Sequence, residues 1–178
     1  MSSSTNLPQV VIETEHGAIT VEIDTENAPG TTANFLRYVE GGFYDGGRFH
    51  RTVTPDNQPN DEIRIAVIQG GVNPRREDER FGPIQLERTT VTGLRHLDGT
   101  ISMARFAPDS AVSDFFICIG DQPSLDYGGM RNPDGQGFAA FGRVVSGMDV
   151  VRTIQHQPHE GQSLTPPVRI NRMRAGQQ

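Results

Sequence analysis

The stretch Ser113-Asp114-Phe115-Phe116-Ile117-Cys118-Ile119 ends in a run of apolar residues that is not interrupted by any polar side chain. Such a run predicts a buried strand rather than a surface turn. Cys118 is the only cysteine of the chain, so it has no partner for an internal disulfide. We expect an unreactive thiol packed inside the protein, which favours a reducing compartment.

Shorter runs on both sides of this stretch predict further strands. Ile19, Val21 and Ile23 alternate with polar residues, and His16-Gly17 just before them predicts a hairpin. The predicted strands are residues 10–15, 18–23, 49–53, 63–68, 100–104, 114–119, 138–145 and 168–173.

Two helices are expected between these strands. The first has N-capping residues, apolar residues at helical spacing and a glycine stop, namely Thr31 and Thr32, then Phe35, Leu36 and Val39, then Gly41-Gly42. Residues 148–154 predict a second, shorter helix. Because the strands and helices do not alternate regularly, they predict a closed or sandwiched antiparallel sheet with helices at its ends.

Composition excludes several classes of function. The 178 residues fit a single domain, and all 16 basic residues are arginine. Without lysine the chain cannot form a Schiff base or supply the lysine of a phosphate-binding loop. The net charge of −6 and the lack of a basic run argue against binding to nucleic acid or to an anionic membrane. Since we find no signal peptide and no spanning apolar run, we expect a soluble, cytoplasmic protein.

The sequence also lacks the usual motifs for a metal, a dinucleotide or an activated nucleophile. His156 and His159 form the only close histidine pair, but Pro158 lies between them and no cysteine cluster supports them. There is no Gly-x-Ser-x-Gly elbow, and Gly135-Gln136-Gly137 lacks the spacing of a dinucleotide fingerprint. We therefore expect neither a metal nor a cofactor.

Five short motifs follow one another in a characteristic order. They are Phe49-His50-Arg51, Gln69-Gly70-Gly71, Ser102-Met103-Ala104-Arg105, Ser113-Asp114-Phe115-Phe116-Ile117 and Phe141-Gly142-Arg143-Val144. With these motifs the chain resembles the cyclophilins, which are peptidyl-prolyl cis-trans isomerases. The resemblance covers nearly the whole chain and includes Ala33-Asn34-Phe35-Leu36, Gly42-Phe43-Tyr44 and Gly147-Met148-Asp149-Val150-Val151.

The resemblance implies a mostly β fold, a closed eight-stranded antiparallel β-barrel capped by two α-helices. This domain is expected in residues 9–173, between a flexible leader (1–8) and a short tail (174–178). The implied activity is rotation about Xaa-Pro bonds in proline-containing peptides and unfolded chains, which assists folding, by a monomer. The alternative is a catalytically weak module that only binds such segments. A third hypothesis is that residues 72–98, an expected surface excursion, dock a specific partner.

The resemblance also assigns roles to individual residues. Arg51 would be the catalytic residue, because its guanidinium can donate a hydrogen bond to the prolyl nitrogen as that nitrogen becomes pyramidal. Phe116 would form the floor of the proline pocket, Gln69 would bind substrate or orient Arg51, and the backbone of Arg105 would hold the residue before proline. The other expected substrate-binding residues are Val67, Ala104, Asp114, Leu125 and Phe138.

Several positions depart from the pattern of the family. Its usual Phe-Met pair before Gln-Gly-Gly is Ala66-Val67 here, after an enlarged segment 54–65, so this wall of the pocket is expected to be shallower or filled from the longer loop. Asp114 replaces a glutamine and is expected to pair with Arg51 or Arg105. Arg105 itself replaces an asparagine. Ser124 replaces an aromatic residue, so binding of cyclosporin should be weak.

Overall fold

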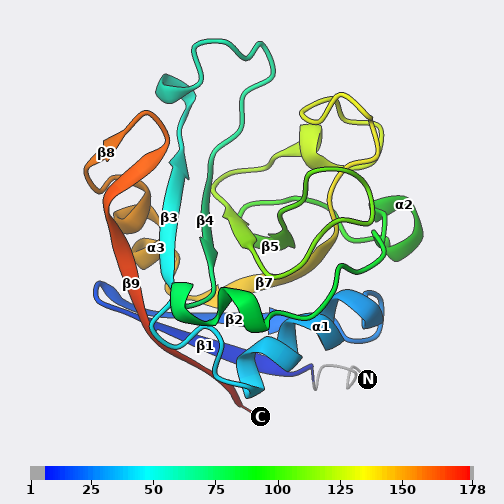
Figure 1. The fold of residues 1–178 in the computed structure, drawn as a ribbon. Coiled ribbons are helices and arrows are strands. Elements are labelled where there is room, and N and C mark those ends of the chain that lie inside the picture. Colours follow the sequence, from blue (N-terminus) through cyan, green and yellow to red (C-terminus); the bar gives the residue numbers. More distant parts are fainter. Residues whose placement is uncertain (1–6, 177–178) are drawn as a thin grey trace.

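The computed structural model describes residues 7–176, in which nine strands form one antiparallel sheet (Figure 1). Leu7 and Pro8, at the end of the expected leader, are described, and residues 1–6 lie outside the described range. The strands are β1 (Gln9–Thr14), β2 (Gly17–Ile23), β3 (Arg48–Val53), β4 (Val67–Gly71), β5 (Thr100–Met103), β6 (Phe115–Cys118), β7 (Ala140–Ser146), β8 (His159–Glu160) and β9 (Ser163–Gly176).

The sheet closes into a barrel. Its order is β1-β2-β7-β5-β6-β4-β3-β9-β8, and β1 also pairs with β9 over Gln9↔Gly176 to Thr14↔Ile170. The two-residue β8 pairs only with β9 and stays outside this ring, which therefore contains eight strands. The predicted eight-stranded antiparallel barrel is confirmed. Strand β9 extends to Gly176, through the first residues of the expected tail.

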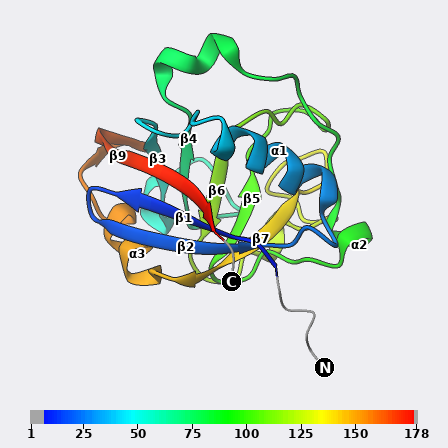
Figure 2. The same ribbon diagram turned by 90° about the horizontal axis from the view of Figure 1, so that it is seen from below.

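Two helices of eight or more residues pack against the barrel, α1 (Pro29–Glu40) against β9 and α3 (Met148–Gln155) against β2, β3 and β4. They lie on different sides of the barrel (Figure 2). A single turn, α2 (Thr89–Thr92), lies in the long connection between β4 and β5. None of the described helices is long and apolar enough to cross a membrane.

The start of α1 differs from the prediction that Thr31 and Thr32 cap it. The helix begins at Pro29, so both threonines lie in its first turn. The Glu87 carboxylate accepts hydrogen bonds from the backbone N–H groups of Gly30 and Thr31, at 3.1 and 2.7 Å. A carboxylate from a distant part of the chain therefore replaces the local cap and complements the helix dipole.

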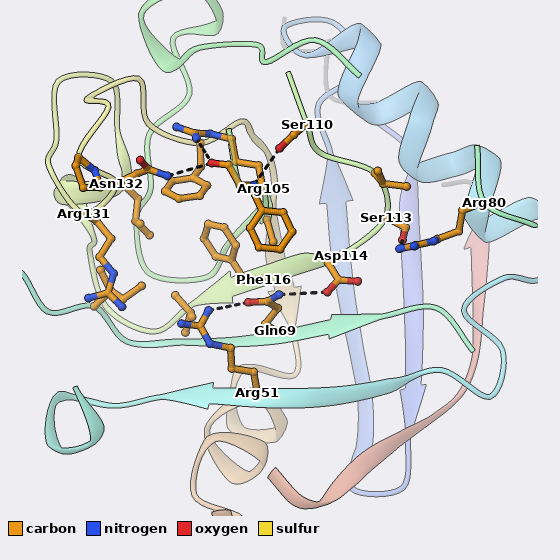
Figure 3. A pocket seen from close by; sticks show the side chains of 18 of the residues that line it. Arg51, Gln69, Arg80, Arg105, Ser110, Ser113, Asp114, Phe116, Arg131 and Asn132 are labelled. Carbon is orange, nitrogen blue, oxygen red and sulfur yellow. Dashed lines mark hydrogen bonds between the residues drawn. The ribbon is translucent and has the colours of Figure 1, made fainter. Parts of the chain in front are cut away.

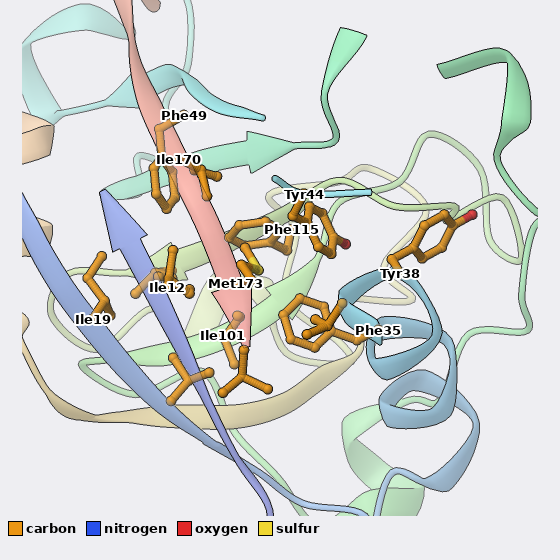
Figure 4. Close-up of a cluster of buried hydrophobic side chains, with 14 of the residues drawn as sticks. Ile12, Ile19, Phe35, Tyr38, Tyr44, Phe49, Ile101, Phe115, Ile170 and Met173 are labelled. Atoms are coloured by element: carbon orange, nitrogen blue, oxygen red, sulfur yellow. The ribbon is translucent and has the colours of Figure 1, made fainter. Parts of the chain in front are cut away.

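The barrel interior is filled by aliphatic and aromatic side chains, several of them in edge-on ring contacts (Figure 4). Phe115 lies at its centre and makes such contacts with Phe35, Tyr44 and Phe49, at centroid distances of 5.8, 5.4 and 5.6 Å. These contacts add to the free energy gained by burying the rings.

Strand β6 is apolar on both faces because it separates two hydrophobic clusters. Phe115 and Ile117 point into the barrel, whereas Phe116 and Cys118 belong to a second cluster on its outer side. This second cluster consists of Val53, Ile65, Val67, Phe116, Cys118 and Leu125, with Ala104 and Phe138 packed against it. It forms the base of the site described below.

The predicted strand 63–68 is wrong over residues 63–66, since β4 begins only at Val67. The preceding segment 54–65 is a loop, which begins with a short 3₁₀ turn at Pro55–Asn57. Gln58, buried inside this loop, hydrogen-bonds both the N–H and the C=O of Ile65, at 3.1 and 2.7 Å. These bonds satisfy the backbone of Ile65 without a neighbouring strand.

Candidate active site

A cavity of about 750 Å³ lies on the outer side of β3, β4 and β6, above the second cluster. Every residue that the resemblance singles out lines it (Figure 3). These residues are Arg51, Val67, Gln69, Ala104, Arg105, Asp114, Phe116, Leu125 and Phe138. Strand alternation explains the grouping, because residues two apart on β4 point to the same side.

The Arg51 guanidinium is held by two glutamine side chains. Its Nη1 donates to Gln69 Oε1 at 2.8 Å, and its Nε and Nη2 donate to Gln162 Oε1 at 3.0 and 2.7 Å. Desolvation by burial, followed by the charge of Arg131, lowers the pKa of Arg51, while Asp61 raises it. A guanidinium stays protonated in proteins, so the cavity contains a fixed, partly desolvated cation.

Gln69 continues this network to Asp114 and His50. The Gln69 Nε2 donates to Asp114 Oδ2 at 3.2 Å, and His50 Nε2 lies 3.2 Å from the same oxygen. The expected pairing of Asp114 with Arg51 or Arg105 is therefore wrong. The side chain of Gln69 lies between Arg51 and Asp114, and it orients the guanidinium while keeping the carboxylate away from it.

The apolar floor of the cavity is Phe116, which is 5% exposed. Its ring stacks on His96, with centroids 6.0 Å apart and planes at 15°, and meets Phe138 edge-on at 5.6 Å. Val67 and Leu125 are buried beside it. The result is an apolar depression at the base of the cavity.

His96 supports this floor from behind through a buried hydrogen-bond network. Its Nδ1 lies 2.7 Å from Asp126 Oδ1, and its Nε2 lies 2.8 Å from Ser102 Oγ. Partial burial raises the pKa of Asp126, but hydrogen bonds from the His96 ring and backbone outweigh this effect. The pKa of Asp126 therefore lies below its usual value. Ser102 and His96 are buried, so this network orients Phe116 rather than meeting a substrate.

The Arg105 side chain ties the loop 127–137 to the end of β5. Its Nη1 and Nη2 each lie 3.0 Å from a carboxylate oxygen of Asp134, and its Nε donates to the C=O of Gly137 at 2.9 Å. The guanidinium also lies over the ring of Phe138, 4.7 Å from its centroid. Among the described residues, none hydrogen-bonds the backbone N–H or C=O of Arg105, so both are available to a ligand.

Comparison with known proteins agrees with this geometry. Residues 9–175 match the family described as cyclophilin type peptidyl-prolyl cis-trans isomerase/CLD. The chain belongs to the cyclophilin family. It is 37% identical to the peptidyl-prolyl cis-trans isomerase cyp18 of Streptomyces antibioticus over 148 residues, 82% of each chain. It is 35% identical to the peptidyl-prolyl cis-trans isomerase B of Escherichia coli over 147 residues, 82% of this chain and 83% of that one.

Solved structures show the same fold. A cyclophilin-type isomerase of Cryptosporidium parvum superimposes with a TM-score of 0.75 at 21% identity, over 96% of this chain and 98% of that one. A second structure of that protein, solved in the presence of the dipeptide Ala-Pro, gives a TM-score of 0.72 at 22% identity, over 93% and 96% of the two chains. As a cyclophilin with these relatives, the chain is a peptidyl-prolyl cis-trans isomerase, and the predicted enzyme class is confirmed.

In this cyclophilin Ala66 and Val67 stand where the family usually has a Phe-Met pair. The enlarged segment 54–65 completes the cavity wall on that side. Ile65, at the end of the segment 54–65, is 6% exposed and lines the cavity. Arg131, from the loop 127–137, lines the cavity as well and donates to Gln58 Oε1 at 2.7 Å. The segment 54–65 and the loop 127–137 therefore meet at one end of the site.

Among the residues that sequence reasoning missed, four have clear contacts within this site: Gln162, His96, Ile65 and Arg131. None lies inside one of the recognised motifs, and each reaches the site through contacts distant in sequence. The length of the segment 54–65 was the only available signal, and it points to Ile65 alone. Within residues 7–176 no three His, Cys, Asp or Glu side chains are grouped to hold a metal ion.

Proposed function

We propose that this cyclophilin binds Xaa-Pro segments with the proline ring on Phe116 and accelerates their rotation with the guanidinium of Arg51. The observation that carries this proposal is the position of a fixed, partly desolvated cation at the edge of an apolar depression. Its partners are the neutral side chains of Gln69 and Gln162, so no carboxylate neutralises its charge.

The chemistry needs only one such group. Rotation about Xaa-Pro must overcome amide resonance, a barrier of about 18–20 kcal/mol. As the bond twists, the prolyl nitrogen becomes pyramidal and regains a lone pair that can accept a hydrogen bond. A donor placed there interacts more strongly with the twisted state than with either planar state, which lowers the barrier.

Arg51 is well suited to this task because it is already positioned before substrate arrives. Each of its three nitrogens donates one N–H to Gln69 or Gln162. Because Nη1 and Nη2 carry two N–H groups each, one N–H on each of them stays free. Positioning by the protein means that little reorganisation is needed in the transition state.

We propose that the free backbone groups of the cavity wall bind the rest of the substrate. The unpaired N–H and C=O of Arg105 are proposed to pair with the residue before proline, next to Ala104. Val67, Leu125 and Phe138 complete the apolar wall around the ring. The natural substrates are then proline-containing segments of flexible or unfolded chains, and we propose that the enzyme acts as a monomer.

Replacing Arg51 tests the mechanism. We expect Arg51→Ala to lower kcat/KM for a short proline peptide by about 100-fold or more, because one oriented transition-state donor is lost. Arg51→Lys should recover little, because a single ammonium cannot keep the contacts to both glutamines. The assay is cis-trans exchange of the peptide measured by NMR, together with the rate of a proline-limited refolding reaction.

The control is Arg48→Ala, which removes an exposed arginine from the same strand but outside the cavity lining. It should leave the exchange rate unchanged. Full activity in Arg51→Ala would refute the mechanism. Peptide binding by the wild-type protein without any exchange enhancement would show that the site captures proline segments without turning them over.

A further inference from the structure

Arg131 places a second guanidinium at one end of the cavity, where the segment 54–65 meets the loop 127–137. Its Nη1 donates to Gln58 Oε1 and to the C=O of Ile63, both at 2.7 Å. Figure 3 shows it at the same end as Arg51, on a different side of Phe116 from Arg105. This end is formed by two loops that lie outside the recognised motifs.

Part of Arg131 is free to bind a ligand. Within the described chain, its Nε and Nη2 make no hydrogen bond, and neither atom is buried. The side chain is only 13% exposed, and it lines the cavity. A guanidinium fixed through one nitrogen and free at the others presents a flat pair of donors that matches a carboxylate.

The charge of Arg131 is only partly compensated. Its nearest acid is Asp61, whose Oδ2 lies 3.3 Å from Nη1 and whose side chain is 47% exposed. The charge of Arg131 also acts on Arg51, whose pKa it lowers in addition to the effect of burial. Two cations at one end of a cavity repel each other, and an anionic ligand group between or beside them would relieve that repulsion.

We propose that Arg131 is a specificity-determining residue that selects substrates with an acidic side chain directly after the proline. This inference rests on the proposed function, in which Arg105 holds the residue before proline. The chain that follows the proline then leaves past Phe116 toward Arg131 and Ile65. A carboxylate there can accept hydrogen bonds from the free Nε and Nη2.

Peptides that differ only after the proline test this proposal. With Ala-Ala-Pro-Xaa peptides in which Xaa is Glu, Gln or Lys, we expect kcat/KM to be highest for Glu and lowest for Lys. The Glu-to-Gln ratio should be about fivefold, the usual range of a partly exposed ion pair, and should fall when NaCl is raised to about 0.5 M. Equal values for Glu and Lys in the wild-type enzyme would overturn the proposal.

Two variants change the charge in opposite directions. Arg131→Gln should abolish the Glu preference, whereas Asp61→Asn should increase it, because it removes the competing carboxylate and keeps the bonds of Arg131 to Gln58 and Ile63. The matched control is Arg64→Gln. Arg64 braces the same segment through the C=O groups of Asp61 and Pro55, at 3.1 and 2.9 Å, but does not line the cavity, so the preference should persist.

The position of the acid is tested by moving Glu to the residue before proline. There we expect no effect of Arg131→Gln, and an Arg131-dependent preference at that position would contradict the assignment. A Glu preference that survives in Arg131→Gln would also refute it. If instead no peptide of the series is isomerised, the proposed function fails rather than the assignment of Arg131.

Discussion

The arginines of this cavity differ in the charge of their partners. Arg105 pairs with a carboxylate, whereas Arg51 is held only by the amide oxygens of Gln69 and Gln162. An amide oxygen orients a guanidinium without neutralising it, so Arg51 keeps its full charge for the substrate. The same residue type therefore anchors a loop in one place and, in the mechanism that we propose, serves catalysis in another.

Phe115 and Phe116 are neighbours with separate tasks, because one points into the barrel and the other into the cavity. Phe116→Leu should reduce kcat/KM by about tenfold, since the flat floor for the ring is lost. Its cost in stability should stay below about 1.5 kcal/mol. Phe115→Leu should destabilise the fold more and leave the activity of the folded protein unchanged. Urea unfolding and peptide exchange on both variants measure this, and equal losses of activity would contradict it.

At the scale of elements, the loop that follows β6 is fastened to the barrel at two points. Asp126 is fixed by His96, and Asp134 by Arg105, so the segment between them cannot move away from the cavity without breaking an ion pair or a buried hydrogen bond. The pKa of Asp134 is lowered mainly by its hydrogen bonds with Arg105. Both carboxylates are therefore stabilised in their charged form.

This arrangement makes stability depend on pH in the acidic range. The folded-state pKa of Asp126 is lowered, so its contribution is complete above the unfolded pKa of about 3.9 and is lost as pH falls through the folded value. We expect Asp126→Asn to be less stable than the wild type at pH 7, with the difference disappearing toward pH 2. The measurement is the free energy of unfolding in urea at several pH values.

Asp78→Asn is the control for this experiment, because Asp78 is exposed and its side chain makes no hydrogen bond or ion pair with another described residue. It should show little difference from the wild type at any pH. A stability difference for Asp126→Asn that stays constant from pH 7 to pH 2 would show that its charge is not involved.

Elements with clear local signals could be predicted, and those fixed by distant contacts could not. The alternation in β2 and the apolar run of β6 identify both strands from the sequence. Residues 63–66 look like a strand because they carry Ile63 and Ile65. The side chain of Gln58, however, hydrogen-bonds the backbone N–H and C=O of Ile65 in place of a neighbouring strand. Likewise the start of α1 is set by Glu87, far along the chain.

At the scale of the whole molecule, the barrel core and the site are separate hydrophobic clusters that share the walls β4 and β6. The motifs located the cavity lining because the residues they contribute to it lie on or next to β3, β4, β5 and β6. Arg131 and Gln162 could not be predicted as site residues. They lie in loops whose positions are fixed only when the barrel closes. We propose that the folding unit includes the residues of β9 up to Gly176, since they pair with β1.

Cys118 lies in the second cluster, on the same face of β6 as Phe116, and burial raises the pKa of its thiol. Because it is the only cysteine, its modification reports on one place alone, the hydrophobic layer that it shares with Phe116. We expect a thiol reagent to label the native protein at least about 1000-fold more slowly than the urea-unfolded chain, since labelling must wait for local opening. A bound proline peptide should slow labelling further. Similar rates for the native and unfolded forms would contradict this. The labelling rate of Cys118 would thus measure how often the cluster beneath the cavity opens in the native protein.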